Sequence, residues 1–323
     1  MTDTNATTHP TADPMRDTDM RASPFGRVAI IGLGLMGGSL GLALRAGGEG
    51  ATRGRVASAV AGYDAAPGVA ERAQARGALD LTCASLAEVV AGADLVVIAT
   101  PTLAAETVLR AVAPSLAPET AVTDVCSVKG RLVRLAPQAL RNPERYVGGH
   151  PMAGLERAGI EAASARLYRG ARWALTPTAQ TAPDALRRVR SLVEALGAEP
   201  VEMAVDAHDA AVAGVSHLPL TIAVGLMRAL AEAEDWPAMA LLAAGSYRDA
   251  TRVAAGDPAM GRDMLLANRE ALLPRLDAFM ATLTELRALI AHGEAASVEA
   301  ALRAAQAERL AWEAARRPPH DGE

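Results

Sequence analysis

The sequence predicts an α/β domain with a doubly wound parallel sheet, followed by an all-helical domain. Between residues 28 and 203, short apolar runs rich in β-branched residues alternate with helix-like stretches. After residue 203, Ala, Leu, Met, Arg and Glu recur at spacings of three and four, which is typical of helices. The chain has 323 residues, and single cores usually stop growing at roughly 250–300 residues. We therefore expect a disordered tail over 1–26, the α/β domain over 27–203 and the helical domain over 204–317.

The strands of the first domain are predicted from apolar runs that suit burial on both faces of a sheet. In chain order they are Val28–Gly32, Val56–Tyr63, Leu95–Thr100, Ala121–Val125, Tyr146–Gly149, Trp173–Thr176 and Pro200–Met203. The helices expected between them are Gly38–Arg45, Gly68–Arg76, Leu103–Leu109, Lys129–Ala139 and Pro183–Leu196. In the second domain, breaks at Pro237, Pro258 and Gly293 predict four or five long helices.

Composition and charge exclude several classes of function. The formal net charge is −5 at pH 7 and no cluster of basic residues stands beside aromatic ones, so a nucleic-acid partner is not expected. The longest apolar runs fall short of the roughly 20 residues of a membrane span, and the first 24 residues lack the apolar core of a secretory signal. Cys83 and Cys126 are expected to be reduced thiols. We expect a soluble, cytoplasmic protein with no membrane partner and no metal site.

A glycine-rich turn follows the first predicted strand. It reads Gly-Leu-Gly-Leu-Met-Gly, and a predicted helix follows directly. In this context the string is the fingerprint of a Rossmann-type dinucleotide-binding domain. Gly32 permits the tight turn, Gly34 lets the backbone approach a pyrophosphate, and Gly37 lets the helix pack closely on the strand. Leu35 and Met36, in the same turn, are also expected to contact the cofactor.

Polar residues follow the next predicted strands. Asp64 ends the second strand, where an acidic side chain accepts hydrogen bonds from the adenosine ribose, which favours NAD over a 2′-phosphorylated cofactor. Thr100 and Pro101 end the following strand, and Ser127 comes after the next one. Ligands of open parallel sheets bind at the carboxyl ends of strands, so these loops should line the nicotinamide and substrate crevice. Ser127 either bonds a substrate hydroxyl or caps the helix that begins near Lys129.

A lone histidine, His150, stands in the segment Gly148–Gly154 at the end of another predicted strand. The glycines and Pro151 of this segment fix the backbone and leave the imidazole as the one reactive side chain. Histidine has the ordinary pKa best placed to accept a proton near neutrality. The alternative is a structural histidine.

A basic pair lies in the helical half. Arg248 and Arg252 are four residues apart on one predicted helix face, which is unfavourable unless an anion lies nearby. A substrate rich in carboxylates would supply that anion. The alternative is a solvated face on which Asp249 screens its neighbours.

Five segments together resemble the prephenate/arogenate dehydrogenase family of tyrosine biosynthesis. They are Gly32–Gly38, Asp124–Lys129, Gly148–Gly154, Ser216–Pro219 and Arg248–Arg252. The resemblance covers roughly residues 27 to 315. It implies NAD as cofactor and the oxidative decarboxylation of prephenate to 4-hydroxyphenylpyruvate, or the corresponding reaction of arogenate. It also implies that the helical domain forms a homodimer.

The resemblance assigns roles to residues of this chain. It implies that His150 is the catalytic histidine that bonds the ring hydroxyl of the substrate, with Ser127 as its partner at that hydroxyl. Arg252 corresponds to the arginine that holds a substrate carboxylate. Arg248 keeps the positive charge that some relatives supply with lysine.

The remaining substrate contacts are implied in the same way. Ser216 and His217 belong to the substrate-binding segment, and Glu156 lies where members often place an acidic residue that gates or tunes the site. Many members read Ser-His-Leu-Pro-His, whereas this chain has Leu220 at the last position. That departure leaves the preference between prephenate and arogenate open.

Two other functions fit the same fold. β-Hydroxyacid dehydrogenases share a Gly-Leu-Gly-x-Met-Gly string and a helical second domain, but their chemistry relies on a lysine in that domain. Here no lysine occurs after Lys129. A non-catalytic NAD-sensing protein would share the fold without turnover, and an assay of NADH formation separates it from an enzyme.

Overall fold

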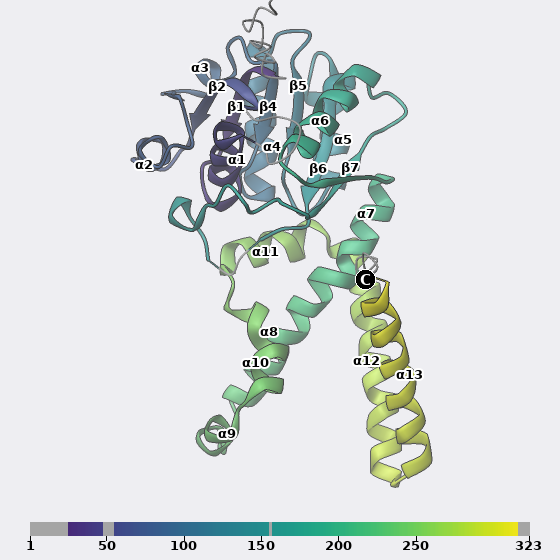
Figure 1. Ribbon diagram of the computed structural model, residues 1–323. Helices are drawn as coiled ribbons and strands as arrows, with labels where there is room; N and C mark the ends of the chain where they lie inside the picture. Colours follow the sequence, from purple (N-terminus) through teal and green to yellow (C-terminus); the bar gives the residue numbers. More distant parts are fainter. Residues whose placement is uncertain (1–24, 48–54, 155–156, 316–323) are drawn as a thin grey trace, which may run out of the picture. The chain divides into compact units, whose positions relative to one another are not determined.

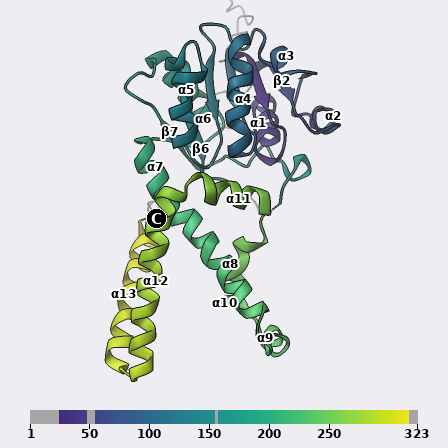
Figure 2. The same cartoon turned by 180° about the vertical axis from the view of Figure 1, so that it is seen from behind.

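The computed structural model describes residues 25–47, 55–154 and 157–315 (Figure 1). The chain divides into two compact units, Met1–Val205 and Asp206–Glu323. The first is an α/β structure with helices on both faces of one sheet (Figures 1 and 2), and the second consists of helices. This confirms the predicted fold class.

Eight strands form the sheet, in the order β3-β2-β1-β4-β5-β6-β7-β8. Their bounds are β1 (Phe25–Ile31), β2 (Ala57–Tyr63), β3 (Leu81–Thr82), β4 (Leu95–Ile98), β5 (Ala121–Asp124), β6 (Tyr146–Pro151), β7 (Arg172–Thr176) and β8 (Glu199–Glu202). Each of the seven predicted strands is present. The strand β3 was not predicted, because two residues carry no detectable alternation.

The direction of the last two strands corrects the prediction of a wholly parallel sheet. The strands from β3 to β6 are parallel, but β7 pairs antiparallel with β6, and β8 is parallel to β7. A parallel neighbour requires a crossover, usually through an α-helix. In the described part of the connection between β6 and β7, the one helical element is the short 3₁₀ turn η3 (Ile160–Ala162). The chain therefore returns alongside β6 in the opposite direction.

The helices of the first unit follow the predicted pattern with one addition. They are α1 (Leu35–Ala46), α2 (Val69–Ala75), α3 (Leu86–Val90), α4 (Thr102–Val112), α5 (Gly130–Ala139) and α6 (Pro183–Ala195). The addition is α3, whose start was readable: Ser85 Oγ accepts a hydrogen bond from the Glu88 amide at 3.2 Å, which is an N-cap.

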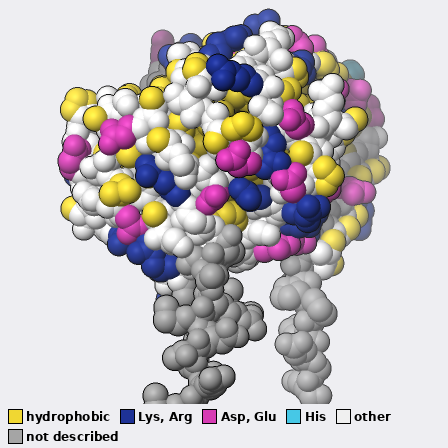
Figure 3. Space-filling view, turned by 90° about the horizontal axis from the view of Figure 1, so that it is seen from above, with side chains coloured by type: hydrophobic (Ala, Val, Ile, Leu, Met, Phe, Trp, Pro, Cys, Tyr) yellow, Lys and Arg dark blue, Asp and Glu magenta, His cyan; other side chains and the backbone are white. Residues whose placement is uncertain are grey.

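Alternate residues of the strands supply two separate cores. Val28 and Ile30 of β1 pack in one core with α1 and α6, whereas Ala29 and Ile31 pack in the other with α4 and α5. This alternation explains the continuous apolar runs in the sequence, since both faces of each central strand are buried. The face of the first unit shown in Figure 3 carries acidic and basic side chains interspersed with one another.

The second unit contains helices that break where the sequence predicts. They are α7 (Val205–Val212), the π-helix η4 (Ala213–His217), α8 (Leu218–Ala231), α9 (Trp236–Leu242), α10 (Gly245–Thr251), the 3₁₀ helix η5 (Arg252–Ala255), α11 (Pro258–Ala267), α12 (Arg269–His292) and α13 (Ala295–Ala314). Pro237 lies in the first turn of α9, Pro258 begins α11, and Gly293, with φ +69°, ends α12. Within the described residues, the four longer helical stretches Val205–Ala231, α11, α12 and α13 agree with the prediction of four or five long helices, whereas the seven-residue helices α9 and α10 were not predicted.

One helical stretch, Val205–Ala231, is long and apolar enough to cross a membrane by length and composition, within the part of the chain that the structure describes. This stretch was not predicted as a possible span, because Pro219 interrupts the apolar run. The π-helix just before Pro219 lets the helix continue despite the missing amide donor. Core helices of soluble proteins meet the same criterion, and three polar side chains of this stretch, His208, Asp209 and His217, are buried within the protein.

Candidate active site

The glycine loop between β1 and α1 has an open, anion-binding geometry. Gly32 has φ +91°, and a Cβ there would lie 2.6 Å from the carbonyl oxygen of Ala99. A Cβ on Gly37 would lie 1.8 Å from the carbonyl oxygen of Gly32, so α1 packs directly on the loop. A Cβ on Gly34 would meet nothing within 4 Å. The first amides of α1 lack intrahelical partners and adjoin this space, so the loop fits a dinucleotide pyrophosphate.

The other predicted cofactor residues lie around this loop. Asp64, at the end of β2, accepts hydrogen bonds from the amides of Leu33 at 2.7 Å and Ala66 at 2.8 Å, which hold its carboxylate beside the loop. Thr100 and Pro101 follow β4, the other neighbour of β1, and the Thr100 hydroxyl is buried without a hydrogen-bond partner among the described residues. That hydroxyl is suited to a ligand.

The first turn of α1 holds the two remaining cofactor candidates. Leu35 and Met36 are half-buried, and the carbonyl oxygen of Met36 accepts a hydrogen bond from the Tyr168 hydroxyl at 2.6 Å. Tyr168 thereby ties this turn to the connection between β6 and β7.

A buried ion pair that the sequence analysis missed lies next to Ser127. The Lys129 ammonium donates to Asp124 Oδ1 and, at 2.5 Å, to the carbonyl oxygen of Gly149, and both charged side chains are fully buried. Asp124 Oδ2 accepts hydrogen bonds from the Tyr146 hydroxyl at 2.6 Å and from the Gly149 amide at 3.4 Å. The ion pair therefore hydrogen-bonds both the carbonyl oxygen and the amide of Gly149, the residue before His150.

One feature of the sequence could have indicated the Lys129–Asp124 ion pair. Lys129 is the single lysine of the chain, and every other basic residue among its 32 Lys and Arg residues is arginine. A compact ammonium fits a fully enclosed position that the larger, planar guanidinium does not.

The structure decides one alternative for Ser127. Ser127 is half-buried in the loop after β5, and α5 begins after Lys129 with no side-chain cap. The prediction that Ser127 caps this helix is therefore wrong, and its hydroxyl is not committed to that role.

His150 lies in β6, opposite Ala174 of β7, and is half-buried. A Cβ on Gly149 would lie 2.6 Å from the carbonyl oxygen of Asp124 and 2.9 Å from Trp173 Nε1, so no larger residue fits there. These contacts fix the backbone that carries the imidazole. Trp173 is a second residue that the sequence analysis did not single out for the site.

The titratable neighbours of the ion pair stay protonated. Burial, together with the Asp124 carboxylate, raises the pKa of the Cys126 thiol and of the Tyr146 phenol well above their ordinary values. Tyr146 is therefore a hydrogen-bond donor at neutral pH. Cys83 and Cys126 are both buried free thiols, as predicted.

Replacing Lys129 by methionine should destabilise the first unit. The change keeps the apolar stem but leaves the Asp124 carboxylate buried and without its cation, which costs about 3–5 kcal/mol of unfolding free energy. Urea unfolding of the full chain measures this loss. The matched control is Arg303→Met, which breaks the exposed pair with Glu299 and should cost less than about 1 kcal/mol. Equal losses in both variants would contradict this account of the buried pair.

The predicted substrate residues of the second unit lie on three neighbouring elements. Ser216 is exposed and His217 fully buried in η4. Arg248 is exposed on α10, with its Nε 3.3 Å from Asp249 Oδ1, and Arg252 is exposed at the start of η5. Both α10 and η5 pack against α8, which continues η4 (Figure 1).

The structure changes the expectation for the basic pair. Arg248 and Arg252 do not share one α-helix as predicted, because α10 ends at Thr251 and the chain tightens into a 3₁₀ turn. The Asp249 contact of Arg248 matches the alternative of a screened, solvated face. Glu156 lies outside the described residues.

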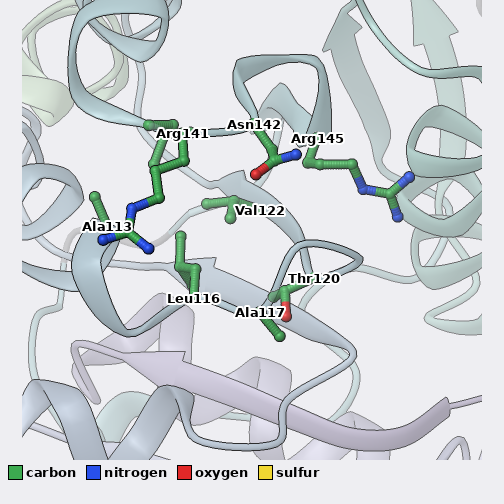
Figure 4. Close-up of a pocket in the computed structure, with 9 residues that line it drawn as sticks. Ala113, Leu116, Ala117, Thr120, Val122, Arg141, Asn142 and Arg145 are labelled. Atoms are coloured by element: carbon green, nitrogen blue, oxygen red, sulfur yellow. The ribbon is translucent and has the colours of Figure 1, made fainter.

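A pocket lies at the amino ends of β5 and β6, whereas the glycine loop and His150 lie at the carboxyl ends of their strands. Figure 4 shows the residues that line it. Its lining includes Thr120, just before β5, and Asn142 and Arg145, just before β6. The Arg145 guanidinium is engaged by Asp184 and by the carbonyl oxygen of Glu119 at 2.6 Å. The pocket is therefore separate from the candidate active site.

Comparison with known proteins gives matches along both units. Residues 46–202 match the model of the prephenate dehydrogenase nucleotide-binding domain, and residues 204–304 match that of the prephenate dehydrogenase dimerization domain. Prephenate dehydrogenase of Bacillus subtilis is 33% identical over 270 residues, which is 83% of this chain and 71% of that protein. Cyclohexadienyl dehydrogenase of Zymomonas mobilis is 36% identical over 83% of this chain and 89% of that protein.

Solved structures give the same result. Prephenate dehydrogenase from Aquifex aeolicus, in complex with hydroxyphenyl propionate and NAD⁺, superposes with a TM-score of 0.80 at 30% identity, covering 88% of this chain and 97% of that one. Arogenate dehydrogenase from Synechocystis gives a TM-score of 0.74 at 31% identity, covering 88% and 99%. Because both domain models match and several relatives exceed 30% identity over most of their length, the chain belongs to the prephenate/arogenate dehydrogenase family.

Proposed function

We propose that this protein is an NAD-dependent prephenate dehydrogenase, which converts prephenate to 4-hydroxyphenylpyruvate by oxidative decarboxylation in L-tyrosine biosynthesis. One observation carries the proposal. Ser127 and His150 lie at the carboxyl ends of the parallel strands β5 and β6, on the same side of the sheet as the glycine loop that follows β1. The Aquifex relative, solved with NAD⁺ and a hydroxyphenyl compound, supports it.

The cofactor residues follow from the fit of the loop. Gly32, Gly34 and Gly37 would hold the pyrophosphate and Asp64 the ribose. In the same proposal, Leu35, Met36, Thr100 and Pro101 contact the rest of the dinucleotide. NAD, when bound, supplies the oxidant of the reaction.

The reaction then needs one proton acceptor from the chain. His150, neutral before reaction, accepts the proton of the ring hydroxyl as that carbon is oxidised to a carbonyl, and Ser127 bonds the same oxygen. The hydride of that carbon would pass to NAD. The ring carboxylate leaves as carbon dioxide, its bonding electrons make the ring an aromatic phenolate, and the His150 imidazolium returns its proton to that oxygen to give the phenol. A general base held in place typically contributes about 10²–10⁴ in rate.

The second unit would hold the anionic parts of the substrate. Prephenate carries two carboxylates, and Arg252 pairs with one of them, with Arg248 adding positive charge nearby. Ser216 and His217 supply neutral hydrogen-bonding groups, and Glu156 tunes the site. An arginine is suited to this role because its planar fork matches a carboxylate.

The same proposal covers assembly and location. We infer a cytoplasmic homodimer with a nucleotide-binding domain over residues 27–203 and a dimerisation domain over 204–317. Large apolar side chains are exposed mainly in the second unit: Val215, Val224, Leu241, Leu242, Met260, Leu266, Leu273, Met280, Leu283, Ile290, Leu302, Leu310 and Trp312. Exposed apolar area of this extent supports burial against a second copy.

Arogenate is the second candidate substrate. The reason to consider it is Leu220, which stands where many family members have a histidine. Leu220 is half-buried in α8, and its Cδ2 lies 3.6 Å from the position of a Cβ on Gly261 of α11. An alkyl group packed there cannot make the hydrogen bond that a histidine at this position would make. The preference between prephenate and arogenate therefore rests on other residues.

Steady-state assays of NADH formation test the proposal. We expect kcat/KM to be highest with prephenate and NAD, and NADP to be used poorly because its 2′-phosphate would meet the Asp64 carboxylate. A higher kcat/KM with arogenate than with prephenate would identify arogenate as the preferred substrate. No turnover with either substrate would contradict the enzymatic function and favour an NAD-sensing protein.

A further inference from the structure

A buried polar cluster joins the π-helix to the start of α12 within the second unit. His217 is fully buried in η4, and Asn268, between α11 and α12, is 4% exposed. The Asn268 amide nitrogen Nδ2 lies 2.8 Å from the carbonyl oxygen of Asp209 and 3.1 Å from His217 Nδ1. One amide group therefore contacts both the backbone of α7 and the ring of His217.

The chemistry of these atoms fixes which one donates. The carbonyl oxygen of Asp209 is an acceptor only, so the Asn268 atom facing it is the NH₂ group rather than the amide oxygen. The second hydrogen of that NH₂ group points to His217 Nδ1. Nδ1 must then be unprotonated, and a neutral His217 carries its proton on Nε2.

His217 Nε2 is buried and has no hydrogen-bond partner among the described residues. An enclosed N–H without an acceptor is costly, and native proteins keep few of them. The helix around it is also irregular, since η4 is a π-helix, a form found frequently at functional sites. Both features set His217 apart from an ordinary core histidine, because its buried Nε2–H needs an acceptor that the described residues do not supply.

We propose that Asn268 is a positioning residue that fixes His217 as its Nε2–H tautomer, so that the imidazole donates a hydrogen bond to a carboxylate or carbonyl oxygen of the substrate. The identity of that ligand rests on the proposed function, whereas the tautomer does not. Asn268 itself does not touch the substrate in this account.

The charge state of His217 agrees with a donor. Burial lowers the pKa of His217 to about 4, the Asp209 carboxylate opposes this shift, and His208 adds to it. His217 therefore stays neutral between pH 5 and 8 and keeps its Nε2 proton. The two histidines then have different tasks, because His150 accepts a proton while His217 only donates a hydrogen bond.

The direct test is nitrogen-15 NMR of the histidine rings in the full chain, with the His217 signals identified by their absence in His217→Gln. The expected spectrum at pH 7 has an unprotonated Nδ1 and a protonated Nε2 for His217, unchanged down to about pH 5. A protonated Nδ1, or an imidazolium at pH 7, would overturn the proposal. This result does not depend on turnover, so failure of the proposed function would appear separately in the assay of NADH formation.

The variant Asn268→Asp tests the role of the amide. A carboxylate accepts rather than donates, so it should move the ring proton to Nδ1 and raise the pKa of His217. We expect KM for prephenate to rise about tenfold, as for one lost hydrogen bond, with a smaller change in kcat. Asn142→Asp, the same change at a residue bonded to Glu144, should leave both the spectrum and KM unchanged. An unaltered His217 tautomer in Asn268→Asp would contradict the proposal.

Discussion

Replacing His150 by asparagine is expected to lower kcat by at least about tenfold, and by as much as about 10²–10⁴, with little change in KM. Asparagine keeps a polar side chain of similar reach on β6 but cannot accept a full proton. The hydroxyl proton must then pass to water while positive charge builds on the ring oxygen. In the proposed mechanism other residues hold the substrate carboxylates, so we expect binding to be largely retained.

Steady-state kinetics on prephenate with saturating NAD measure this effect. The matched control is His292→Asn, because His292 is an exposed histidine at the end of α12, and its kcat should equal that of the unaltered protein. Near-normal turnover in His150→Asn would remove His150 from the role of general base.

Replacing Arg252 by glutamine should produce the second large effect. Removing the cation leaves a substrate carboxylate without its partner, and such a loss costs roughly 2–5 kcal/mol. That cost corresponds to a fall in kcat/KM of about 30-fold to several thousand-fold. Because the contact exists in both the bound substrate and the transition state, the fall should come mainly from a higher KM.

Two further variants make this result specific. Arg252→Lys keeps the charge but loses the planar fork, so we expect a KM between those of the unaltered protein and Arg252→Gln. Arg228→Gln removes an exposed arginine that pairs with Glu232 on α8, and it should leave KM unchanged. An unchanged KM in Arg252→Gln would place this arginine outside the substrate site.

The strands and the glycine loop could be predicted from the sequence because their signals are local. A buried parallel strand is a continuous apolar run, and Gly32, Gly34 and Gly37 answer backbone requirements within one turn. The direction of β7 was missed although a signal for it existed. No helix is predicted between Tyr146–Gly149 and Trp173–Thr176, and a connection without a crossover helix favours an antiparallel neighbour.

The residues of the candidate site also differ in whether a local sequence signal could predict them. His150 and Asp64 could be chosen because each stands at the end of a predicted strand in a recognisable segment. The contact of Lys129 with Gly149 spans 20 residues, and that of Asn268 with His217 spans 51. Neither pairing has a periodic signature in the sequence, since each forms only when separate elements pack together.

The central claim is that the imidazole of His150 takes the proton from the substrate hydroxyl beside the nicotinamide. A crystal structure of the complex with NAD and hydroxyphenyl propionate tests it most directly. We predict a His150 ring nitrogen within hydrogen-bond reach of the phenolic oxygen, about 2.6–3.2 Å, with the nicotinamide next to the same ring. A dinucleotide bound along the glycine loop with the His150 side chain far from the nicotinamide would contradict the claim.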